Sequence, residues 1–584
     1  MARTIADQLV EQLIDAGVDH IYGIVGDSLN PIVDAVRRSG GAKKGGIDWI
    51  HVRHEEAAAF MAAAEAQLTG KLAVCAGSCG PGNLHLINGL YDAHRSGAPV
   101  LAIASHIPSA EIGSGYFQET HPDRLFVDCS NYCEMIATAP QSPRVVNSAL
   151  RHAIAGPGVA VVVMPGDVAE FEASDSFPAL VMTGPGILVP DETDVRALAK
   201  AIDKARTVAI FAGAGVKGAH DEVIEFADLV KAPIGHSLRG KQWIQYDNPF
   251  DVGMTGLLGY GAAHAGIHDA DLLLLVGTDF PYEQFLPDPG KVVIGQIDTD
   301  AAHLGRRVSV AHPVHGDVRA TLALLTDLVK PKKSTAFLDR TLKRHEKLLD
   351  SVVGTYTDVA TTTPIHPEYA ITLIDEAASE NAVFTADTGM GNVWQARYIT
   401  PTPDRRIIGS FLHGSMANAV PHALGAQVAY PDRQVVAIAG DGGLSMLLGE
   451  LITAVDYALP IKVFVFNNST LGLVRLEMLV NGYPSFGVDV PAVDYAGIAA
   501  AIGFHAERVE DPTRLADAVT DAFAHEGPVL VDIITDPRAL SLPPAITGEQ
   551  VKGFALAMSK TVLNGGAGEA IAMARSNIRH LPGL

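Results

Sequence analysis

The chain has little cysteine and few aromatic residues. Four cysteines occur among 584 residues, and aromatic side chains make up 6%. This low cysteine content excludes a disulfide framework and fits reduced thiols in the cytoplasm. Cys75 pairs with Cys79 and Cys129 with Cys133 along the chain, but three residues inside each pair are not the usual spacing of zinc ligands.

Long apolar runs and basic charge are also missing. No run of 18 apolar residues occurs, so no segment is long enough to span a bilayer as a helix. Asp7, Glu11 and Asp15 interrupt the first helical pattern, where a secretory signal would be apolar. Lysine and arginine number 43 against 66 acidic residues, and the net charge is −23. That balance disfavours nucleic acid as a partner, because phosphate contacts need a basic patch.

Glycine and aliphatic residues are, by contrast, abundant. Hydrophobic residues make up 48% of the chain and glycine occurs 57 times, which suits α/β sheets with tight strand-to-helix turns. A chain of this length holds about three domains. Apolar runs that end in glycine loops recur at 20–27, 72–77 and 272–277. The sequence therefore predicts an α/β protein with three doubly wound, parallel-sheet domains.

The most informative motif is split between two predicted strands. Gly440-Asp441-Gly442 ends the apolar run 435–439, and Asn467-Asn468 ends the run 461–466. Asn468 lies 27 positions after Asp441, the length of one strand–helix–strand crossover with 445–458 as its helix. Parallel strands end at a shared sheet edge, where open α/β sheets bind ligands. A carboxylate and an amide oxygen there suit Mg²⁺ that completes its octahedron with diphosphate oxygens and water.

Alone, Gly440 to Gly443 would be only a turn. The two apolar strands, the crossover spacing and the paired asparagines favour a binding site instead. This combination resembles the diphosphate-binding motif of thiamine diphosphate (ThDP) enzymes. The resemblance implies ThDP and Mg²⁺ as cofactors, with Asp441, Asn468 and Thr470 as metal ligands. Further implied ThDP contacts are Gly442, Gly443, Ser469, Leu471 and Gly472.

A second ThDP feature lies near the N-terminus. The cofactor becomes reactive when its own aminopyrimidine takes a proton, and that needs a carboxyl group against the ring nitrogen. In 53–62, Glu55 and Glu56 open a helix that is otherwise almost wholly apolar. Acidic residues at a helix start also complement the helix dipole, so a structural role is the alternative. By resemblance Glu55 is the activating glutamate, and Glu56 faces elsewhere on the helix.

The resemblance assigns roles to further residues. Gly414-Ser415-Met416 matches the segment whose apolar side chain wedges ThDP into a folded V shape, and core packing is the alternative for Met416. Phe117 and Gln118 are implied neighbours of cofactor and substrate. Glu477 stands where relatives place an acid close to the reacting carbon, although it would otherwise be a solvated helix carboxylate. Leu473 stands where family members often carry an aromatic residue that is thought to assist electron transfer to the flavin. The resemblance therefore leaves the rate of this electron transfer open.

The middle part of the chain, 190–332, decides which ThDP reaction is expected. Its glycine-containing segments resemble the FAD-binding segments of the pyruvate oxidase branch. Gly213-Ala214-Gly215 alone is weak, because it lacks the spacing of a full dinucleotide fingerprint. Asp298, at a strand end, suits an adenosine hydroxyl. The implied FAD contacts are Gly213, Gly215, Thr255, Gly256, Leu257, Leu258, Gly277, Thr278, Asp279, Phe280, Pro281 and Asp298.

Three longer runs, 79–90, 113–122 and 413–419, resemble the bacterial quinone-linked subgroup of that branch. The resemblance implies oxidative decarboxylation of pyruvate to acetate and CO₂, with electrons passed to FAD and then to a membrane quinone. The alternatives are a phosphate- and oxygen-dependent oxidase that makes acetyl phosphate, an acetolactate synthase-type carboligase, and a non-catalytic ThDP-binding regulator. Intact Glu55, Asp441 and Asn468 argue against the last. In the family these groups meet between subunits, so at least a dimer, commonly a tetramer, is expected.

The C-terminal tail follows no sheet pattern. Positions 551, 554, 555, 558 and 562 share one apolar helical face, and four basic residues stand against two acidic ones from Glu549 to Leu584. A locally cationic amphipathic helix suits a phospholipid surface, and packing on the protein itself is the alternative. By resemblance the tail covers the active site at rest. Reduction of the flavin would release it, so that a cytoplasmic protein becomes peripheral on the inner face of the cell membrane.

These features divide the chain into five predicted parts. The segments 56–82 and 417–443 look internally related, as two similar sheets that hold one cofactor from opposite ends would be. The parts are a pyrimidine-binding domain (1–182), an FAD-binding domain (190–332), a linker (333–366), a diphosphate-binding domain (367–537) and the amphipathic tail (538–584).

Overall fold

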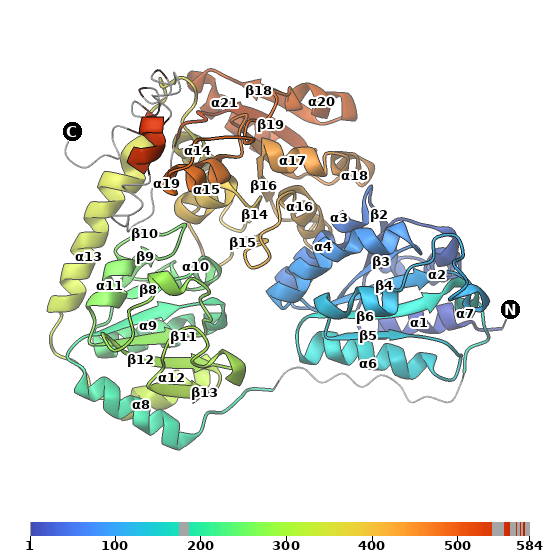
Figure 1. Ribbon diagram of the computed structural model, residues 1–584, viewed down its shortest axis with the longest axis horizontal. Coiled ribbons are helices and arrows are strands. Elements are labelled where there is room, and N and C mark those ends of the chain that lie inside the picture. The colour runs from blue at the N-terminus through green and yellow to red at the C-terminus, as the bar shows by residue number, and fades with distance from the viewer. Residues whose placement is uncertain are drawn as a thin grey trace.

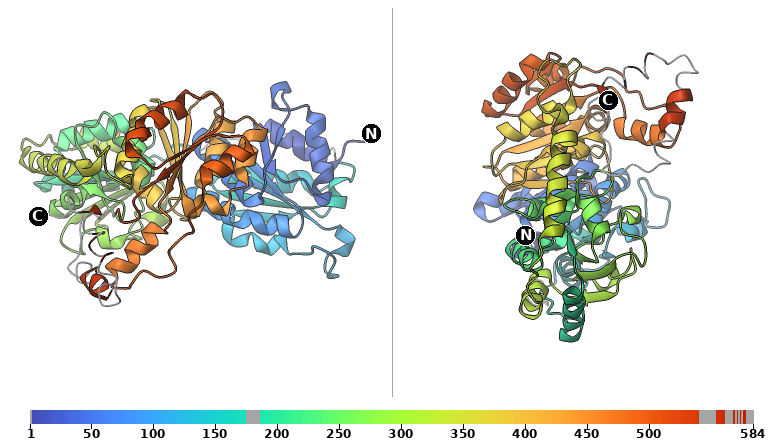
Figure 2. Two further views of the ribbon diagram at one scale, coloured as in Figure 1. Left: turned by 90° about the horizontal axis from the view of Figure 1, so that it is seen from above. Right: turned by 90° about the vertical axis from the view of Figure 1, so that its left-hand side faces the viewer.

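Three separate β-sheets, each covered by helices, make up the protein (Figure 1). The structure is a computed structural model that describes residues 2–174, 186–539, 554–560, 568, 571, 573, 576 and 577. Seen from above, the domain of the third sheet lies between the other two (Figure 2). The architecture confirms the predicted α/β fold with three domains, whereas most of the stretch between the first and second domains lies outside the described residues.

The first sheet has six parallel strands in the order β2-β1-β3-β4-β6-β5. Its central strands β3, β4 and β6 are buried throughout, because helices cover both faces. The strands are β1 (His20–Gly23), β2 (Asp48–His51), β3 (Ala73–Gly77), β4 (Val100–His106), β5 (Tyr132–Met135) and β6 (Val159–Pro165). The helices are α1 (Ile5–Asp15), α2 (Asn30–Ser39), α3 (Glu55–Thr69), α4 (Pro81–Ser96), α5 (Pro122–Leu125), α6 (Ser142–Ala155) and α7 (Gly166–Ala169).

The second sheet has seven strands in the order β10-β9-β8-β7-β11-β12-β13. It departs from the all-parallel prediction at one edge, where β9 and β10 pair antiparallel through a tight connection. The strands are β7 (Val208–Ala212), β8 (Ile234–His236), β9 (Asp251–Met254), β10 (Tyr260–Gly261), β11 (Leu272–Val276), β12 (Val293–Asp298) and β13 (His312–His315). The helices are α8 (Glu192–Lys204), α9 (His220–Val230), α10 (Leu238–Ile244), α11 (Ala263–Asp269), α12 (Val318–Leu328) and α13 (Ala336–Leu348).

The third sheet repeats the first in design, with six parallel strands in the order β15-β14-β16-β17-β19-β18. The strands are β14 (Val383–Ala386), β15 (Arg406–Gly409), β16 (Val435–Gly440), β17 (Lys462–Asn467), β18 (His505–Val509) and β19 (Val529–Ile534). The helices are α14 (Pro367–Ala377), α15 (Met390–Tyr398), α16 (Ala419–Ala429), α17 (Asp441–Met446), α18 (Glu450–Asp456), α19 (Gly472–Val480), α20 (Tyr495–Ile502) and α21 (Leu515–Ala524).

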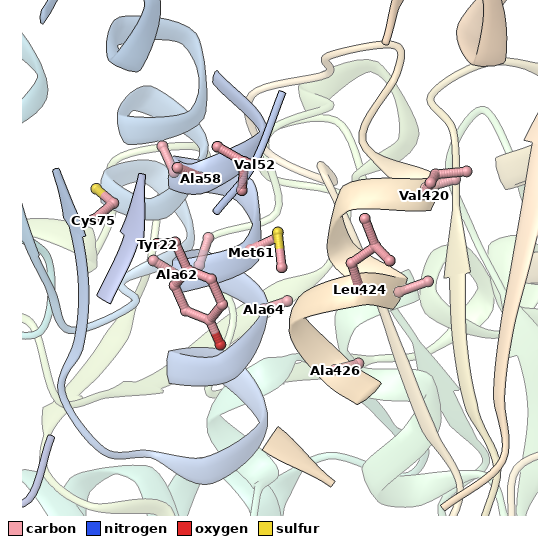
Figure 3. Packing of buried hydrophobic residues seen from close by; sticks show 14 of the residues in the cluster. Tyr22, Val52, Ala58, Met61, Ala62, Ala64, Cys75, Val420, Leu424 and Ala426 are labelled. Atoms are coloured by element: carbon pink, nitrogen blue, oxygen red, sulfur yellow. The ribbon is translucent and has the colours of Figure 1, made fainter. Parts of the chain in front are cut away.

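The first and third domains share one hydrophobic core, centred on α3 and α16 (Figure 3). Both helices are rich in alanine, so their backbones approach closely. A side chain at Gly425 would place its Cβ only 2.3 Å from the carbonyl oxygen of Met61. Farther along, the Tyr430 hydroxyl donates to the carbonyl of Leu68 at 3.0 Å. The two helices therefore run in the same direction, and their N-terminal ends lie together.

Two predicted helices differ in detail. The predicted crossover 445–458 is two short helices, because α17 already begins at Asp441 and a separate α18 begins at Glu450. Of the predicted tail helix, residues 554–560 are described and helical, whereas positions 551 and 562 lie outside the described residues. Within the part of the chain that the structure describes, every helix is too short or too polar to cross a bilayer.

Candidate active site

Asp441 joins the two halves of the split motif. It follows β16 directly, and its Oδ1 accepts the amide of Gly442 at 3.0 Å. Its Oδ2 accepts the amide of Ser469 at 2.7 Å, at the end of the neighbouring β17. The predicted meeting of both motif halves at one sheet edge is therefore present in the structure.

The donors around Asp441 suit a hard cation. Asn468 Oδ1 accepts the Thr470 amide at 3.0 Å, which holds the amide side chain beside the turn. The Thr470 hydroxyl donates to the carbonyl of Val488 at 3.1 Å, so its oxygen lone pairs and the main-chain carbonyl of Thr470 are both neutral oxygens suited to a metal. Among the described residues no three His, Cys, Asp or Glu side chains gather as a metal site. One carboxylate and two neutral oxygens fit Mg²⁺ that is completed by diphosphate and water.

Burial raises the pKa of Asp441 from its ordinary value of 3.8 to about 6. A metal ligand must be deprotonated, so Mg²⁺ bound at Asp441 would compete with this proton. Because the pKa is raised, the competition acts below pH 6 and vanishes above it. We expect the affinity for Mg²⁺ with ThDP to be nearly constant from pH 7 to 8 and to fall about tenfold per unit below pH 6. Titration calorimetry across this range checks the prediction, and an affinity independent of pH down to 5 contradicts it.

The predicted wedge residue lies against the motif. A Cβ at Gly442 would come within 2.8 Å of Leu471 Cδ2 and 3.3 Å of Met416 Cε, so both side chains lie directly against this turn. Ala417, the next residue after the wedge, has φ +65°, a left-handed conformation that costs energy for alanine. Met416 is thus held next to the diphosphate turn by a strained loop. Gly414 and Ser415 belong to the same loop, with φ +81° at Gly414.

Asp387 is a site residue that the sequence reasoning missed. It follows β14, and its carboxylate accepts the amides of Ala419 at 2.9 Å and Gly440 at 3.2 Å. Any Cβ at Gly443 would lie 2.2 Å from its Oδ2. Burial raises its pKa to about 6. The Asp387 carboxylate therefore links the start of α16, just after the Met416 loop, to the turn that begins at Gly440.

Replacing Asp387 with alanine should loosen both segments at once. We expect the Kd for ThDP to rise by about 10–100-fold, the usual effect of losing a group that orients ligands. The amides of Ala419, which is buried, and Gly440, which is partly buried, would lose their acceptor, so the melting temperature should also fall. Asp432→Ala, at an exposed position before β16, serves as the control. ThDP affinity unchanged in Asp387→Ala would contradict this role.

Glu55 is buried at the first position of α3, with 6% of its surface exposed. Its Oε2 lies 2.8 Å from Nδ1 of His85 on α4, and the His85 ring stacks on His54 at a centroid distance of 4.3 Å. A Cβ at Gly82 would lie 3.0 Å from Glu55 Oε1, so glycine keeps the other side of the carboxylate open. A buried carboxylate with open space beside it suits contact with a ring nitrogen. His85 was not singled out from the sequence, although it lies inside the run 79–90.

Asn88 connects the activating end of α3 to the wedge loop. Its Nδ2 donates to Glu56 Oε1 at 2.7 Å and to Ser415 Oγ at 2.9 Å, and its Oδ1 lies 2.7 Å from His413 Nε2. Glu56 is thus used in structure, in agreement with its predicted separation from Glu55. Within one chain, Asn88 therefore places the start of α3 beside the Met416 loop, whereas the resemblance implies that Glu55 and the diphosphate motif of one site come from different subunits.

The implied substrate neighbours lie in two other segments. Phe117 is 78% exposed, and Gln118, with φ +63°, packs against Gly80 at the start of α4. Leu473 is half-buried in α19, which begins directly after the diphosphate motif, and Glu477 is exposed on the same helix.

The predicted FAD segments gather at the carboxyl edge of the second sheet. Gly213 follows β7 and Gly277 follows β11, and a Cβ at Gly215 would lie 2.6 Å from the Cα of Gly277. Two glycine turns therefore touch backbone to backbone, which only residues without a side chain allow. Asp298, at the end of β12, is 7% exposed, and its Oδ1 lies 3.3 Å from Nδ1 of His303. Thr255, Gly256, Leu257 and Leu258 form the loop between β9 and β10, and Phe280 packs edge-on against Phe211.

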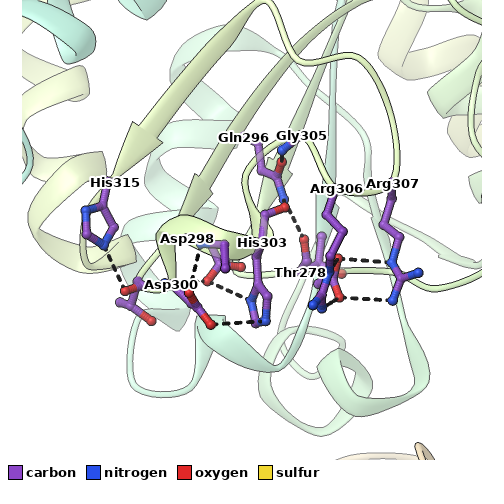
Figure 4. A network of polar contacts seen from close by, with 12 residues as sticks. Thr278, Gln296, Asp298, Asp300, His303, Gly305, Arg306, Arg307 and His315 are labelled. Carbon is purple, nitrogen blue, oxygen red and sulfur yellow. Dashed lines mark hydrogen bonds and ion pairs between the residues drawn. The ribbon is translucent and has the colours of Figure 1, made fainter. Parts of the chain in front are cut away.

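Two arginines at this edge also escaped sequence reasoning. Arg306 and Arg307 both bind Asp279, and Arg307 Nε lies 3.2 Å from Asp279 Oδ1 (Figure 4). Burial alone would raise the pKa of Asp279, but the hydrogen bonds from the two guanidinium groups lower it. Asp279 therefore positions both arginine side chains. Their guanidinium groups are partly exposed and are suited to binding a diphosphate.

Comparison with known families gives the class of protein. Residues 3–125 match the thiamine pyrophosphate enzyme N-terminal TPP binding domain, 195–325 the central domain and 387–533 the C-terminal TPP binding domain. The chain belongs to the ThDP-dependent enzymes, with an activity of the decarboxylase and carboligase type.

Individual relatives include both a pyruvate oxidase and a probable acetolactate synthase. The chain is 36% identical to a putative thiamine pyrophosphate-containing protein YdaP of Bacillus subtilis, over 96% of both chains. It is 32% identical to a pyruvate oxidase of Lactiplantibacillus plantarum, over 92% of this chain and 89% of that one. It is 30% identical to a probable acetolactate synthase large subunit of Methanococcus aeolicus, over 92% and 93%. The protein is thus a member of the pyruvate oxidase and acetolactate synthase family of ThDP enzymes.

Proposed function

We propose that the protein oxidises pyruvate to acetate and CO₂, with FAD and then a membrane quinone as electron acceptors. One observation carries this proposal. The same chain that has the ThDP motif has a second candidate binding site at the carboxyl edge of the second sheet, where two glycine turns touch and Arg306 and Arg307 bind Asp279. The similarity to a pyruvate oxidase supports the same reaction class.

The residues of the site divide the work. Asp441, Asn468 and an oxygen of Thr470 would hold Mg²⁺, and Met416 would set the shape of the cofactor beside Gly442. Glu55 would hold the proton shared with the aminopyrimidine, in a pocket where burial keeps water away. Bound ThDP supplies a carbanion and an electron sink for decarboxylation, and bound FAD accepts the electrons.

An anaerobic titration tests the proposal. Pyruvate added to enzyme loaded with ThDP, Mg²⁺ and FAD should bleach the flavin absorbance, and a soluble quinone analogue should restore it. Acetate should form without any need for phosphate. Product that depends on phosphate would favour the acetyl phosphate-forming oxidase, and acetolactate with no bleaching would favour a carboligase.

We propose further that the active enzyme is a homo-oligomer, at least a dimer and commonly a tetramer in this family. The large exposure of Phe117 beside the site supports a second copy as its cover. Sedimentation of the purified enzyme tests the assembly, and an active monomer would refute it.

The tail would control the site and bind phospholipid on the inner face of the cell membrane. Ala557 and Met573 pack on Leu476 and Leu479 of α19, the helix that follows the diphosphate motif. Lys560 Nζ also donates to the carbonyl of Gly482, just after that helix, at 2.9 Å. A docked tail thus rests on the element that carries Leu473 and Glu477.

Deletion of the residues after 540 should remove both proposed roles of the tail, inhibition of the active site and binding to phospholipid. We expect turnover with a soluble acceptor to rise at least fivefold, within the usual coupling range of about 5–150-fold. Binding to phosphatidylglycerol vesicles in a flotation assay should disappear. An enzyme that is neither activated nor released from vesicles by the deletion would contradict the proposed switch.

A further inference from the structure

A cavity of about 560 Å³ lies between the middle domain and the third domain. Its volume is in the usual range for small-molecule sites, about 300–1,000 Å³. The residues implied for ThDP, Mg²⁺ and FAD do not line it. Its walls come from α10, the strands β9 and β10, the end of α13 and residues 399–403.

Lys241 forms the inner end of this cavity and is 1% exposed. Its ammonium group donates to the carbonyl of Ala396 at 2.7 Å and to the Tyr260 hydroxyl at 3.4 Å. Among the described residues no carboxylate lies within ion-pair distance of it. Burial lowers its pKa to about 8, which leaves it mostly protonated at neutral pH. Asp375 and Asp251 favour the charged form only from beyond ion-pair distance. A buried ammonium with no carboxylate in direct contact is costly, and an incoming anion would relieve that cost.

The other charged groups at the inner end have partners. Asp251 accepts hydrogen bonds from Gln245 Nε2 and the Gly253 amide, both at 3.1 Å. It also faces His236 at 3.5 Å and His345 at 3.9 Å, whose pKa values burial lowers.

Arg397 donates to the carbonyl of Gly259 at 2.9 Å, in the loop implied to contact FAD, and Glu368 lies close enough to affect its pKa. Asp247 and Glu380 line the cavity but are exposed, where water and salt screen them. Among these buried charged groups, the Lys241 ammonium is therefore the cation with no carboxylate in direct contact, and Asp375 and Asp251 act on it only from farther away.

Tyr260 adds a second donor. Its hydroxyl oxygen accepts hydrogen bonds from Gln245 at 2.6 Å and from Lys241. In the described part of the chain this hydroxyl donates to no acceptor, so its proton is available to a ligand. We propose that the cavity binds a small oxyanion, a carboxylate or a phosphate group, through Lys241 and Tyr260. This site is separate from the ThDP centre, and its test does not depend on the reaction proposed above.

Calorimetry on the holoenzyme tests the proposal. The enzyme is first saturated with ThDP, Mg²⁺ and FAD, so that the cofactor phosphate sites are filled. Inorganic phosphate and acetate are then titrated separately at constant ionic strength. One saturable site per chain is expected for at least one of them. Preference for phosphate identifies a phosphorylated ligand, and preference for acetate identifies a carboxylate.

Two variants locate the binding. Lys241→Met removes the charge, and Leu349→Trp fills the cavity without touching the hydrogen bonds of Lys241. Each should weaken binding at least tenfold, whereas Lys330→Met, at an exposed position outside the cavity, should not. If Lys241→Met does not fold, Leu349→Trp alone decides. Absence of saturable binding of both ions, or binding that survives in a folded cavity variant, overturns the proposal.

Discussion

Glu55→Gln is expected to lower kcat with pyruvate by about 10²–10⁴-fold, the usual contribution of a positioned general acid or base. The amide keeps the shape and can still meet His85 on α4, where the carboxylate Oε2 now lies 2.8 Å away. It cannot hold the proton that activates the aminopyrimidine. Cofactor binding should change far less than turnover, because the residues assigned to the metal and the diphosphate lie on the third domain.

Glu56→Gln is the matched control on the same helix. Glu56 receives a hydrogen bond from Asn88 at 2.7 Å, and a glutamine oxygen can accept the same bond. We expect its kcat to stay close to that of the unmodified enzyme. Equal losses in the two variants would show that the acidic pair is structural, and full activity in Glu55→Gln would remove the assigned role.

Asp441→Ala is expected to abolish cofactor retention. The substitution removes the only carboxylate assigned to Mg²⁺ and the acceptor that joins Gly442 to Ser469. Loss of a group that merely orients a ligand costs about 10–100-fold in metal affinity, so loss of the ligand itself should exceed about 100-fold. The Kd for Mg²⁺ at saturating ThDP, measured by calorimetry at pH 7.5, gives this value.

Asp489→Asn is the control for Asp441→Ala, because Asp489 is an exposed acid bridged to Thr470 by backbone alone. It should bind Mg²⁺ normally. An Asp441→Ala enzyme that still binds ThDP and Mg²⁺ with ordinary affinity would place the metal elsewhere.

Those parts of the site that depend on local pattern were predictable from the sequence. Asp441 and Asn468 each follow an apolar run, and parallel pairing of β16 with β17 brings such ends together. Glu55 opens a helix whose small apolar residues mark burial on every side. The family resemblance then supplied roles that spacing alone could not.

Other site residues could not be predicted because their roles arise from tertiary contacts. Asp387 is a single acid after a short strand, and only the folded chain brings the amides of Ala419 and Gly440 to it. His85 and Asn88 look like ordinary helix residues until α4 packs against α3. The burial of Lys241 likewise could not be predicted, because it arises where the second domain contacts Ala396 of the third.

The broken crossover has a similar cause. Glu450 is the first residue of α18, and its Oε1 accepts the amides of Arg53 and His54, both at 2.9 Å, from the first domain. This contact places the start of α18 against the start of α3. The helical periodicity of 445–458 could not predict this contact, because its partners lie almost 400 positions away in the sequence.

The most direct test of the account is the exchange of the thiazolium C2 hydrogen of bound ThDP for deuterium, measured by acid quench and NMR. In the unmodified enzyme, exchange should be at least as fast as turnover. In Glu55→Gln, with ThDP still bound, it should slow toward the rate of the free cofactor. Equal exchange rates in the two enzymes would contradict the claim that Glu55 activates a cofactor anchored at Asp441.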